Sequence, residues 1–314
     1  MSAFTSLSQQ QLATLLKPYR LRAIDYRVAS EGIENSNFFV RAEDCDKPGD
    51  DSAAEKHRQR QLVLTILENI PASALGWFIE LLTRLEALGL PVARPLDSTS
   101  GPILDFQGKP VLLVPRLPGS HVSVPTTAHC QAIGAALATL HGCQIGRPTE
   151  HDGPAEQLVS LIPLLNKLTA EQQHDARPLL EAWSRREGTP VLCHGDLFRD
   201  NALFEGDRLS GLLDLYNAGH ELAVWDLAVA SNDWCVLPDG RPDPERERAL
   251  LIGYGRTRTL PMTELALLPL ARTIAALRFW LSRLRETPAG AQGRGGKDPE
   301  EFARIYRARR ERLA

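Results

Sequence analysis

Apolar residues recur at helical spacing in two stretches of the first third of the chain. Residues 6–19, SLSQQQLATLLKPY, place leucines on one helical face behind a serine that can cap a helix start. Residues 73–90 repeat this spacing and stop at Gly89, just ahead of Pro91, and both residue types end helices. The pattern therefore predicts one short helix and one longer helix.

Runs rich in β-branched and aromatic residues predict strands in the same part of the chain. Four such runs lie at residues 36–42, 60–68, 101–106 and 109–117. The last two are joined by a turn around Gln107 and Gly108. We therefore expect an antiparallel sheet with one main helix, in the order strand, strand, helix, strand, strand.

From residue 129 onward the pattern is mainly helical, interrupted by one hairpin at residues 201–215. This change predicts an α+β protein with two lobes: a small antiparallel-sheet lobe at residues 1–115 and a larger, mostly helical lobe at 116–314. A cleft between two such lobes is the default ligand site. Residues 43–60 are highly charged and almost without apolar side chains, so we expect a disordered surface insertion there.

Composition and charge then narrow the class of protein. The 314 residues are 43% hydrophobic and 24% charged, and the net charge of −3 provides no basic field for nucleic acid or an anionic membrane. Five scattered cysteines without a C-x-x-C pair argue against a disulfide framework or a zinc knuckle. The first residues lack the features of a signal peptide, and the most apolar late stretch contains arginines, so we expect a cytoplasmic protein without a membrane span. The basic residues 302–314 are expected to form a solvated terminal helix.

Acidic and amide side chains gather around the predicted hairpin. Asp196 lies in the loop before it, Asn201 opens its first strand and Asp214 follows its second. If residues 206–207 form a two-residue turn, Asn201 pairs with Leu212, and Asp214 is its diagonal neighbour on the same face. Two carboxylates and an amide are the hard oxygen ligands that Mg²⁺ prefers. The hairpin is therefore a candidate magnesium site.

Residues 194–201, HGDLFRDN, followed by Asp214, look like the catalytic loop and metal-binding aspartate of kinases. The glycine after the histidine, and WDLA at 225–228, resemble the aminoglycoside phosphotransferase and choline kinase superfamily. Within it, several stretches in the same order are similar to homoserine kinases of the choline-kinase-like type. These are EGIENSNFFV at 31–40, VLLVPRLPGSH at 111–121, RFWLSRL at 278–284 and KDPEEF at 297–302.

The resemblance implies a protein-kinase-like fold and an enzyme that uses ATP and Mg²⁺ to phosphorylate the hydroxyl of a small amino acid or amino alcohol, with homoserine as the leading acceptor. Carried across by position, Asp196 is the expected catalytic base, and Asn201 and Asp214 are the expected metal ligands. His194 is expected to brace the loop, and Asp226 to orient it by hydrogen bonding.

The chain departs from the kinase pattern at the lysine that contacts the nucleotide phosphates. Thr65 stands at that position, while Glu80 on the following helix is available as the glutamate that pairs with such a lysine. Glu80 is equally consistent with a solvated helix position. Arg199, inside the catalytic loop, is one hypothesis for the missing positive charge.

The segment that resembles a phosphate loop has few glycines, so Asn35 and Ser36 are expected to contribute donors to the phosphates. A hinge that pairs with adenine is expected in the backbone of Pro115, Arg116 and Leu117. Both expectations rest on the resemblance.

A homoserine-like acceptor carries an ammonium and a carboxylate, and therefore requires an acid and an arginine. Asp233 and Arg278 are the candidate partners, although Arg278 is also consistent with a salt bridge on its helix. Trp234 is a candidate pocket wall, but tryptophans at such positions are more often core residues.

Two alternative functions remain open at this stage. The first is a kinase for another amino alcohol, such as choline, ethanolamine, hydroxylysine or an aminoglycoside; few aromatic residues cluster late in the chain, which disfavours choline. The second is a catalytically silent nucleotide-binding protein of the same fold. Thr65 favours this second alternative, and the intact set of Asp196, Asn201 and Asp214 weighs against it.

Overall fold

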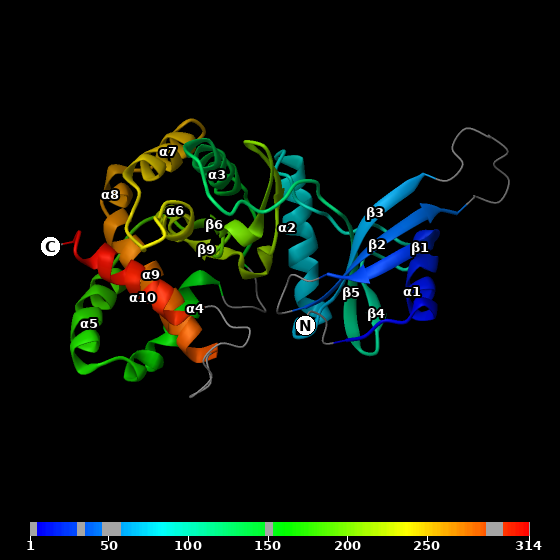
Figure 1. Ribbon diagram of the computed structural model, residues 1–314, viewed down its shortest axis with the longest axis horizontal. Helices are drawn as coiled ribbons and strands as arrows, with labels where there is room; N and C mark the ends of the chain where they lie inside the picture. Colours follow the sequence, from blue (N-terminus) through cyan, green and yellow to red (C-terminus); the bar gives the residue numbers. More distant parts are fainter. Residues whose placement is uncertain (1–4, 30–34, 46–57, 148–152, 287–297, 314) are drawn as a thin grey trace. The chain divides into compact units, whose positions relative to one another are not determined.

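The computed structural model describes residues 5–29, 35–45, 58–147, 153–286 and 298–313 (Figure 1). The chain divides into two compact units. The first comprises Met1–Ala87 and Val92–Leu117, and the second comprises Leu88–Pro91 and Pro118–Ala314. The main division thus follows Leu117, whereas the sequence pattern placed it after residue 115.

The first unit contains a five-stranded antiparallel sheet with the strand order β1-β2-β3-β5-β4. The strands are β1 (Leu21–Val28), β2 (Ser36–Asp44), β3 (Gln59–Ile66), β4 (Leu104–Phe106) and β5 (Lys109–Pro115). The four predicted strands are present, and β1 is an additional one. Only Leu21 of β1 is buried, and charged residues follow it, which is typical of an edge strand and hides β1 from a search for apolar runs.

Helix α1 (Gln9–Leu16) covers one face of this sheet (Figure 1). Its start is fixed by a capping box between Ser8 and Gln11, as the sequence predicts. The core between helix and sheet includes Leu12, Leu15, Leu16, Phe38, Val40, Leu62, Leu64, Ile66, Val111 and Leu113. Because side chains alternate along a strand, Asn37 and Thr65 lie on the opposite face of the sheet.

Two chain reversals of the first part lie where the sequence predicts them. Helix α2 (Leu75–Ala87), preceded by a 3₁₀ turn at Ala72–Ala74, is followed by Gly89 with a φ of +81°. Gln107 (φ 57°) and Gly108 (φ 79°) form the turn between β4 and β5. Positive φ values at consecutive residues are typical of a tight hairpin turn.

The prediction of a disordered insertion at residues 43–60 is wrong at both ends of that segment. Glu43 belongs to β2 and pairs with Gln59 of β3, so both ends of the charged segment form regular antiparallel structure. An ion pair between Arg60 and Asp44, 2.8 Å between Nη2 and Oδ1, accompanies the pairing. Backbone hydrogen bonding therefore extends the strands into residues that carry no apolar side chain. Residues 46–57 of the segment lie outside the described residues.

The second unit is mostly helical. Its helices are α3 (Thr127–Leu140), α4 (Pro154–Leu161), α5 (Ala170–Ser184), α6 (Ala223–Trp234), α7 (Pro244–Gly255), α8 (Met262–Leu265), α9 (Leu268–Glu286) and α10 (Pro299–Arg310). Helix α6 lies at the centre: nearly all its residues are buried, and it packs on α9 (Figure 1). Helix α9 also packs on α10. Of the helices in the described ranges, none combines the length and the apolar run that a bilayer crossing needs.

Two small antiparallel ribbons accompany the helices. Strand β6 (Val191–Cys193) pairs with β9 (Gly219–Glu221), and β7 (Ala202–Glu205) pairs with β8 (Arg208–Leu212). Short 3₁₀ turns at Arg199–Asn201 and Leu215–Asn217 lie just before β7 and just after Asp214. The second unit therefore holds the whole predicted catalytic loop and hairpin.

The C-terminal helix α10 corrects the prediction of a solvated terminal helix. Its buried residues are Phe302, Ala303, Ile305, Tyr306 and Arg309. Because basic residues dominate the sequence of α10, these buried positions are not evident from the sequence alone.

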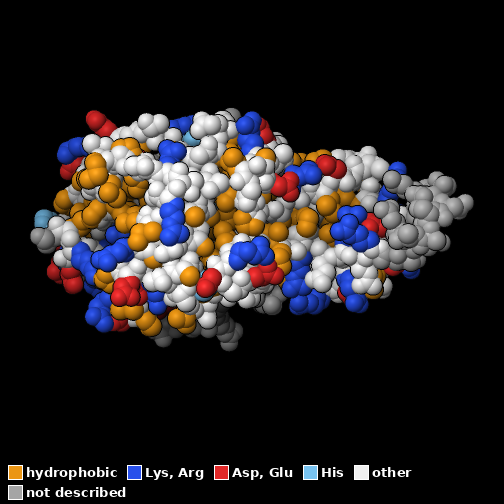
Figure 2. Space-filling model, turned by 90° about the horizontal axis from the view of Figure 1, so that it is seen from above, with side chains coloured by type: hydrophobic (Ala, Val, Ile, Leu, Met, Phe, Trp, Pro, Cys, Tyr) orange, Lys and Arg blue, Asp and Glu red, His pale blue; other side chains and the backbone are white. Residues whose placement is uncertain are grey.

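On the molecular face shown in Figure 2, basic and acidic side chains are interspersed among apolar ones.

Candidate active site

The first turn of α6 fixes the start of the predicted catalytic loop. Asp226 is fully buried, and its two carboxylate oxygens accept the backbone N–H groups of His194 (2.6 Å) and Gly195 (2.8 Å). His141 Nε2 lies 3.2 Å from the same carboxylate. Charge-assisted bonds to two consecutive peptide groups hold both the position and the direction of a chain. These are the contacts of a carboxylate that orients the loop.

His194 connects the two ends of the site. Its ring is buried, and Nε2 lies 3.0 Å from the carbonyl oxygen of Leu213, while the Asp196 N–H points to Nδ1 at 3.4 Å. Burial lowers the pKa of His194, which favours the neutral ring. The two contacts then require the proton on Nε2, because a carbonyl can only accept. His194 thus braces the loop from within.

Asn201 holds the candidate base. Its Nδ2 donates to the backbone oxygen of Asp196 (2.8 Å) and to Asp196 Oδ2 (3.3 Å). Its backbone oxygen accepts the N–H of Leu213 (2.9 Å), the residue before Asp214. Since the amide nitrogen faces Asp196, the amide oxygen is the atom of Asn201 that suits a cation. The oxygen atoms of Asn201 and Asp214 are ligands that fit Mg²⁺, and the Asp196 carboxylate lies beside Asn201 as the candidate base.

Asp214 adopts the left-handed conformation, with φ 56° and ψ 50°. Aspartate tolerates this conformation better than most residues. Burial raises the pKa of Tyr216, and the nearby Asp214 carboxylate raises it further. Tyr216 is therefore a neighbour of the candidate metal site that the sequence motif does not reveal.

The register of the hairpin differs from the prediction by one residue. The turn has the expected two residues, but Ser210 forms a bulge, so that the residue after Asn201 pairs with Leu212 and Asn201 itself faces Leu213. Ser210 Oγ donates to the carbonyl oxygen of Pro118 at 2.7 Å. This contact with a segment 92 residues earlier in the chain stabilises the bulge. The sequence of the turn alone therefore does not predict the bulge.

The sequence suggests Arg199 for the nucleotide phosphates and Asp233 for the acceptor ammonium, but the two side chains form an ion pair. Asp233 Oδ2 accepts the backbone N–H of Arg199 (2.7 Å) and its Nε–H (3.1 Å), and Oδ1 accepts from Nη2 (3.1 Å). The remaining Nη1 donates to the carbonyl oxygen of Ser123 (2.7 Å). Burial raises the pKa of Asp233, and the Arg199 guanidinium opposes this rise. The arginine expected at the phosphates and the acid expected at the acceptor ammonium instead bind each other.

Arg278 lies close to the candidate metal loop. It is buried, its guanidinium carbon lies 4.0 Å from the Phe279 ring centroid, and its Nη2 donates to Gln157 Oε1. Gln157 Nε2 in turn donates to Asn217 Oδ1 at 3.0 Å, in the turn that follows Asp214. Arg278 is therefore joined to the site through one glutamine.

Trp234 belongs to the core of the second unit. Its side chain is fully buried, and its indole N–H donates to the backbone oxygen of Leu197 at 3.1 Å. Trp280 is also buried and packs on Tyr306, with 5.6 Å between ring centroids. Trp234 is thus a core residue that supports the catalytic loop through this hydrogen bond. This placement corrects the expectation that Trp234 forms a pocket wall.

The side chains expected to serve as phosphate donors anchor the start of β2 in the first unit. Ser36 is fully buried, its hydroxyl donates to Glu68, and it accepts the N–H of Thr5 at 2.9 Å. Asn35 Oδ1 accepts the N–H of Glu68 at 3.2 Å. The Ser36 hydroxyl is therefore bound to Glu68 and is not the expected phosphate donor, whereas Asn35 uses only its amide oxygen here and its donor role stays a prediction.

Thr65 and Glu80 have separate partners within the first unit. Thr65 Oγ1 donates to Asn37 Oδ1 at 2.7 Å across β2 and β3. The Glu80 side chain is 52% exposed and pairs with Arg84, one turn later on the same helix. The structure thus favours the solvated helix position for Glu80.

The expected hinge is partly used by the sheet. Pro115 pairs with Leu62 at the end of β5, and the N–H of Arg116 donates to the backbone oxygen of Gln61 at 2.9 Å. That N–H group is therefore bound within the sheet, while an adenine contact through the other backbone groups of residues 115–117 stays a prediction. Leu117 is the last residue of the first unit.

Among the described residues, His141, Cys193 and Asp226 form a group whose potential ligand atoms all lie within 4.8 Å of one another. Both Asp226 oxygens already accept backbone N–H groups, and burial raises the pKa of the Cys193 thiol well above its usual value. A protonated thiol is a poor metal ligand. We therefore interpret this group as support for the catalytic loop.

Comparisons with known proteins identify the family of the chain. Residues 25–260 match the model of the phosphotransferase enzyme family. Homoserine kinase of Pseudomonas aeruginosa is 40% identical over 313 residues, which cover 96% of this chain and 94% of the relative. Homoserine kinases of Cupriavidus taiwanensis and Methylobacillus flagellatus are 37% and 34% identical, and each match covers 98% of this chain and 95% of the relative.

Solved structures show the same fold. An amicoumacin kinase in complex with AMP-PNP and Ca²⁺ superposes with a TM-score of 0.69 at 18% identity, covering 96% of this chain and 92% of that chain. A choline/ethanolamine kinase family protein from Mesorhizobium loti gives a TM-score of 0.59 at 16% identity, covering 90% and 86%. At these identities the similarity concerns the fold alone.

Proposed function

The chain belongs to the phosphotransferase enzyme family, and on that basis we propose that it transfers the γ-phosphoryl group of ATP to the hydroxyl of L-homoserine. The choice of acceptor is supported by identities of 34–40% with homoserine kinases over nearly the whole length of both chains. The observation that carries the chemistry is the pair of hydrogen bonds from Asn201 to Asp196. They bring the candidate base beside the candidate metal ligand.

In the proposed reaction, Asp196 accepts the proton of the homoserine hydroxyl. The hydroxyl oxygen forms a bond to the γ-phosphorus while the bond to the β–γ bridging oxygen breaks, giving O-phosphohomoserine and ADP. Asn201 and Asp214 are the residues proposed to hold Mg²⁺, which when bound neutralises phosphate charge. The chain itself contributes position: His194, Asn201 and Asp226 keep the loop in one geometry.

We assign the acceptor carboxylate to Arg278. The Arg278 guanidinium is buried next to Phe279 and is joined through Gln157 to the turn that follows Asp214. It provides the cation that a carboxylate requires. We do not assign the acceptor ammonium to Asp233, because that carboxylate is bound to Arg199. Homoserine phosphorylation is a step of threonine biosynthesis, so a small-molecule acceptor and a nucleotide are the proposed partners, with the cytoplasm as the proposed location.

A coupled assay of ADP release over a panel of acceptors tests the proposal. The panel contains homoserine, choline, ethanolamine, hydroxylysine and an aminoglycoside. We expect kcat/KM for homoserine to exceed that for every other acceptor by at least about 10-fold, since a missing polar contact in a site built for it costs at least that much. A higher value for another amino alcohol would replace homoserine, and no ADP with any acceptor would reject kinase activity.

A further inference from the structure

We propose that Arg199 and Asp233 form a positioning pair that sets the geometry of the catalytic loop, in place of the substrate-binding roles that the sequence suggests for each. The inference deepens the proposed kinase function and depends on it for its kinetic consequence. Neither residue needs to touch a substrate. The pair acts through Asn201 and Asp196.

The contacts of Asp233 fix a peptide as well as a side chain. One oxygen receives both the backbone N–H and the Nε–H of Arg199, and the other receives Nη2. A salt bridge between two side chains leaves the backbone free to rotate, whereas this arrangement holds the peptide at the middle of the loop. The Asp233 side chain is 12% exposed, so water competes little for these bonds.

The opposite side of the same turn is held by His121. Its Nδ1 lies 3.3 Å from the carbonyl oxygen of Arg199 and 3.1 Å from that of Ala202. In the 3₁₀ turn Arg199–Asn201, Asp233 therefore binds the backbone N–H of Arg199, and His121 lies at hydrogen-bond distance from its carbonyl oxygen. Asn201 is the last residue of this turn, and its side chain is bonded to Asp196.

Helix α6 supplies two such carboxylates. Asp226 and Asp233 are separated by about two helical turns and therefore lie on the same side of the helix. Asp226 accepts N–H groups at the start of the loop, and Asp233 accepts one at its middle. One rigid buried helix thus defines the distance between the two fixed points of the loop.

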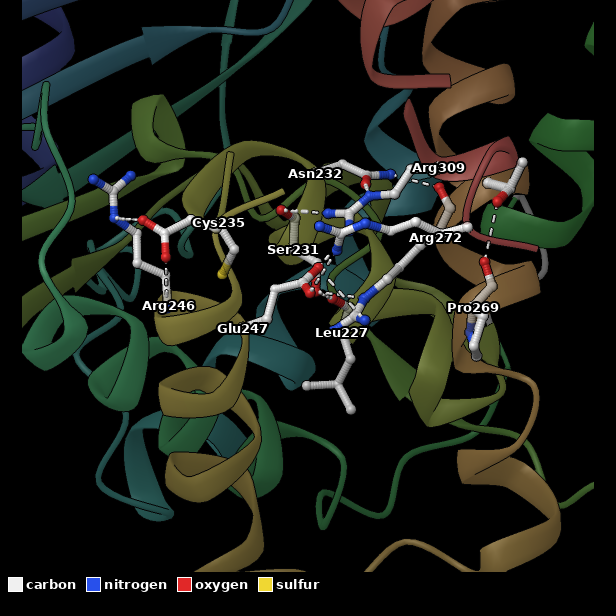
Figure 3. Close-up of polar contacts among 12 residues, drawn as sticks. Leu227, Ser231, Asn232, Cys235, Arg246, Glu247, Pro269, Arg272 and Arg309 are labelled. Carbon is white, nitrogen blue, oxygen red and sulfur yellow. Dashed lines mark hydrogen bonds and ion pairs between the residues drawn. The ribbon is translucent and has the colours of Figure 1, made fainter. Parts of the chain in front are cut away.

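The last turn of α6 is itself fixed by a buried network (Figure 3). Asn232, the residue before Asp233, accepts from Arg309 Nε (2.8 Å) and donates to the backbone oxygen of Arg272 (2.7 Å). Glu247 pairs with both arginines. Helices α7, α9 and α10 therefore hold the residue before Asp233, which supports the positioning pair.

The alternative role of Arg199 as a phosphate ligand would have to compete with these contacts. Its Nε and Nη2 are bound to Asp233 and its Nη1 to Ser123, so all three guanidinium nitrogens already donate within the second unit. Removing the guanidinium from Asp233 would also leave a buried carboxylate without its counter-charge.

Kinetics of Asp233→Asn, Arg199→Gln and the double variant test the pair. We expect each single variant to lower kcat at least about 30-fold while the KM values for ATP and homoserine change less than about 3-fold. The double variant should be no slower than the slower single variant, since the two changes remove one interaction. Arg199→Lys keeps the charge and should recover part of kcat. Should Asp233→Asn not fold, Arg199→Gln and Arg199→Lys provide the same comparison.

Asp239→Asn is the matched control. Asp239 Oδ1 accepts the backbone N–H of Arg241 (3.0 Å) and Oδ2 accepts its Nε–H (2.7 Å), so an aspartate binds the same two donor groups of an arginine at an exposed position. We expect this variant to keep wild-type kcat. The pair would lose its proposed role if Asp233→Asn left kcat within about 3-fold of the wild type. It would also lose that role if the variants raised KM for homoserine or ATP at unchanged kcat, because those results indicate direct binding.

Hydrogen exchange separates this inference from the proposed function. In Asp233→Asn, amides of residues 194–204 should exchange at least about 10-fold faster than in the wild type, while those of β2 and β3 remain unchanged. If the wild type phosphorylates no acceptor but this local loosening occurs, the kinase proposal fails and the positioning pair stands. Unchanged exchange at 194–204 would reject the pair whatever the activity.

Discussion

The hydrogen bonds between Asn201 and Asp196 connect two residues whose loss should have different kinetic effects. Asp196→Asn removes the proposed base and leaves the proposed metal ligands, so kcat should fall by about 10²–10⁴ while the dependence on Mg²⁺ concentration stays the same. Asn201→Ala should instead increase the Mg²⁺ concentration required for half-maximal activity. Steady-state kinetics over a Mg²⁺ titration distinguishes the two. Normal turnover of Asp196→Asn would remove Asp196 as the base.

The environment of His194 predicts a dependence of stability on pH. Burial lowers its pKa below the ordinary value of 6.5, so below that pH the unfolded chain binds the proton more readily than the folded protein. This contribution to the free energy of unfolding is complete above about pH 6.5 and is lost as the pH falls towards the folded pKa.

Urea unfolding of the wild type and His194→Asn between pH 7.5 and 5 measures this contribution. We expect the slope of stability against pH to be shallower in the variant. His174→Asn, at an exposed position on α5, is the control and should keep the wild-type slope. An unchanged slope in His194→Asn would mean that other groups produce the acid sensitivity.

At the residue scale, the sequence predicts contacts within the candidate site only where the residues form one short motif. Asp196 and Asn201 lie in one loop, and their hydrogen bonds join neighbours in the chain. Arg199 and Asp233 are 34 residues apart, and each was assigned a separate partner because their contact depends on the path of α6. Long-range pairs of this kind require a structure.

Among secondary-structure elements, the packing of α3 on α7 depends on glycine. A Cβ built at Gly134 would lie 2.0 Å from the backbone oxygen of Leu250, and one at Gly253 would lie 2.0 Å from that of Gln131. Gly134→Ala should therefore lower the free energy of unfolding by about 1–3 kcal/mol, since the two helices must separate. Denaturant unfolding would measure this change.

Gly76→Ala on α2 is the matched control for Gly134→Ala. Nothing lies within 4 Å of its Cβ position, so the better helix propensity of alanine should raise stability by up to about 1 kcal/mol. Opposite signs for the two substitutions are the expected result. A neutral Gly134→Ala would show that α3 and α7 can adjust.

The sequence predicts a helix end or a turn correctly where the signal lies in a few neighbouring residues. The capping serine, the glycine after α2 and the Gln107–Gly108 turn all lie where the sequence places them. The hairpin register was wrong by one residue, because a contact between Ser210 and Pro118 stabilises a bulge that the turn residues do not specify. Edge strand β1 was missed because charged residues follow one buried leucine.

For the whole molecule, the order of motifs along the chain was sufficient to predict the family and the α+β class, and the family match over residues 25–260 agrees. The role of the C-terminal helix was not predictable in this way. Its sequence is rich in arginine, and nothing in that composition distinguishes Arg309, which is buried on Glu247, from Arg307, which is exposed. The difference arises from the packing of α10 on α9.

Arg309 joins two parts of the second unit that are distant in the sequence, because it links α10 to the turn of α6 that carries Asp233 (Figure 3). The Arg309 side chain is 3% exposed. Arg309→Ala would remove one of the positive charges that pair with the Glu247 carboxylate in a buried site. We expect the free energy of unfolding to fall by about 3 kcal/mol or more.

Arg307→Ala on the same helix removes an exposed pair with Glu300 and should cost less than about 1 kcal/mol. Thermal and urea unfolding of both variants, with kcat measured well below each transition, gives the comparison. Because Arg309 holds Asn232, the residue before Asp233, kcat of Arg309→Ala should fall even where the protein is fully folded, and that of Arg307→Ala should not. If Arg309→Ala were destabilised but fully active while folded, the last helix would support the fold without influencing the catalytic loop.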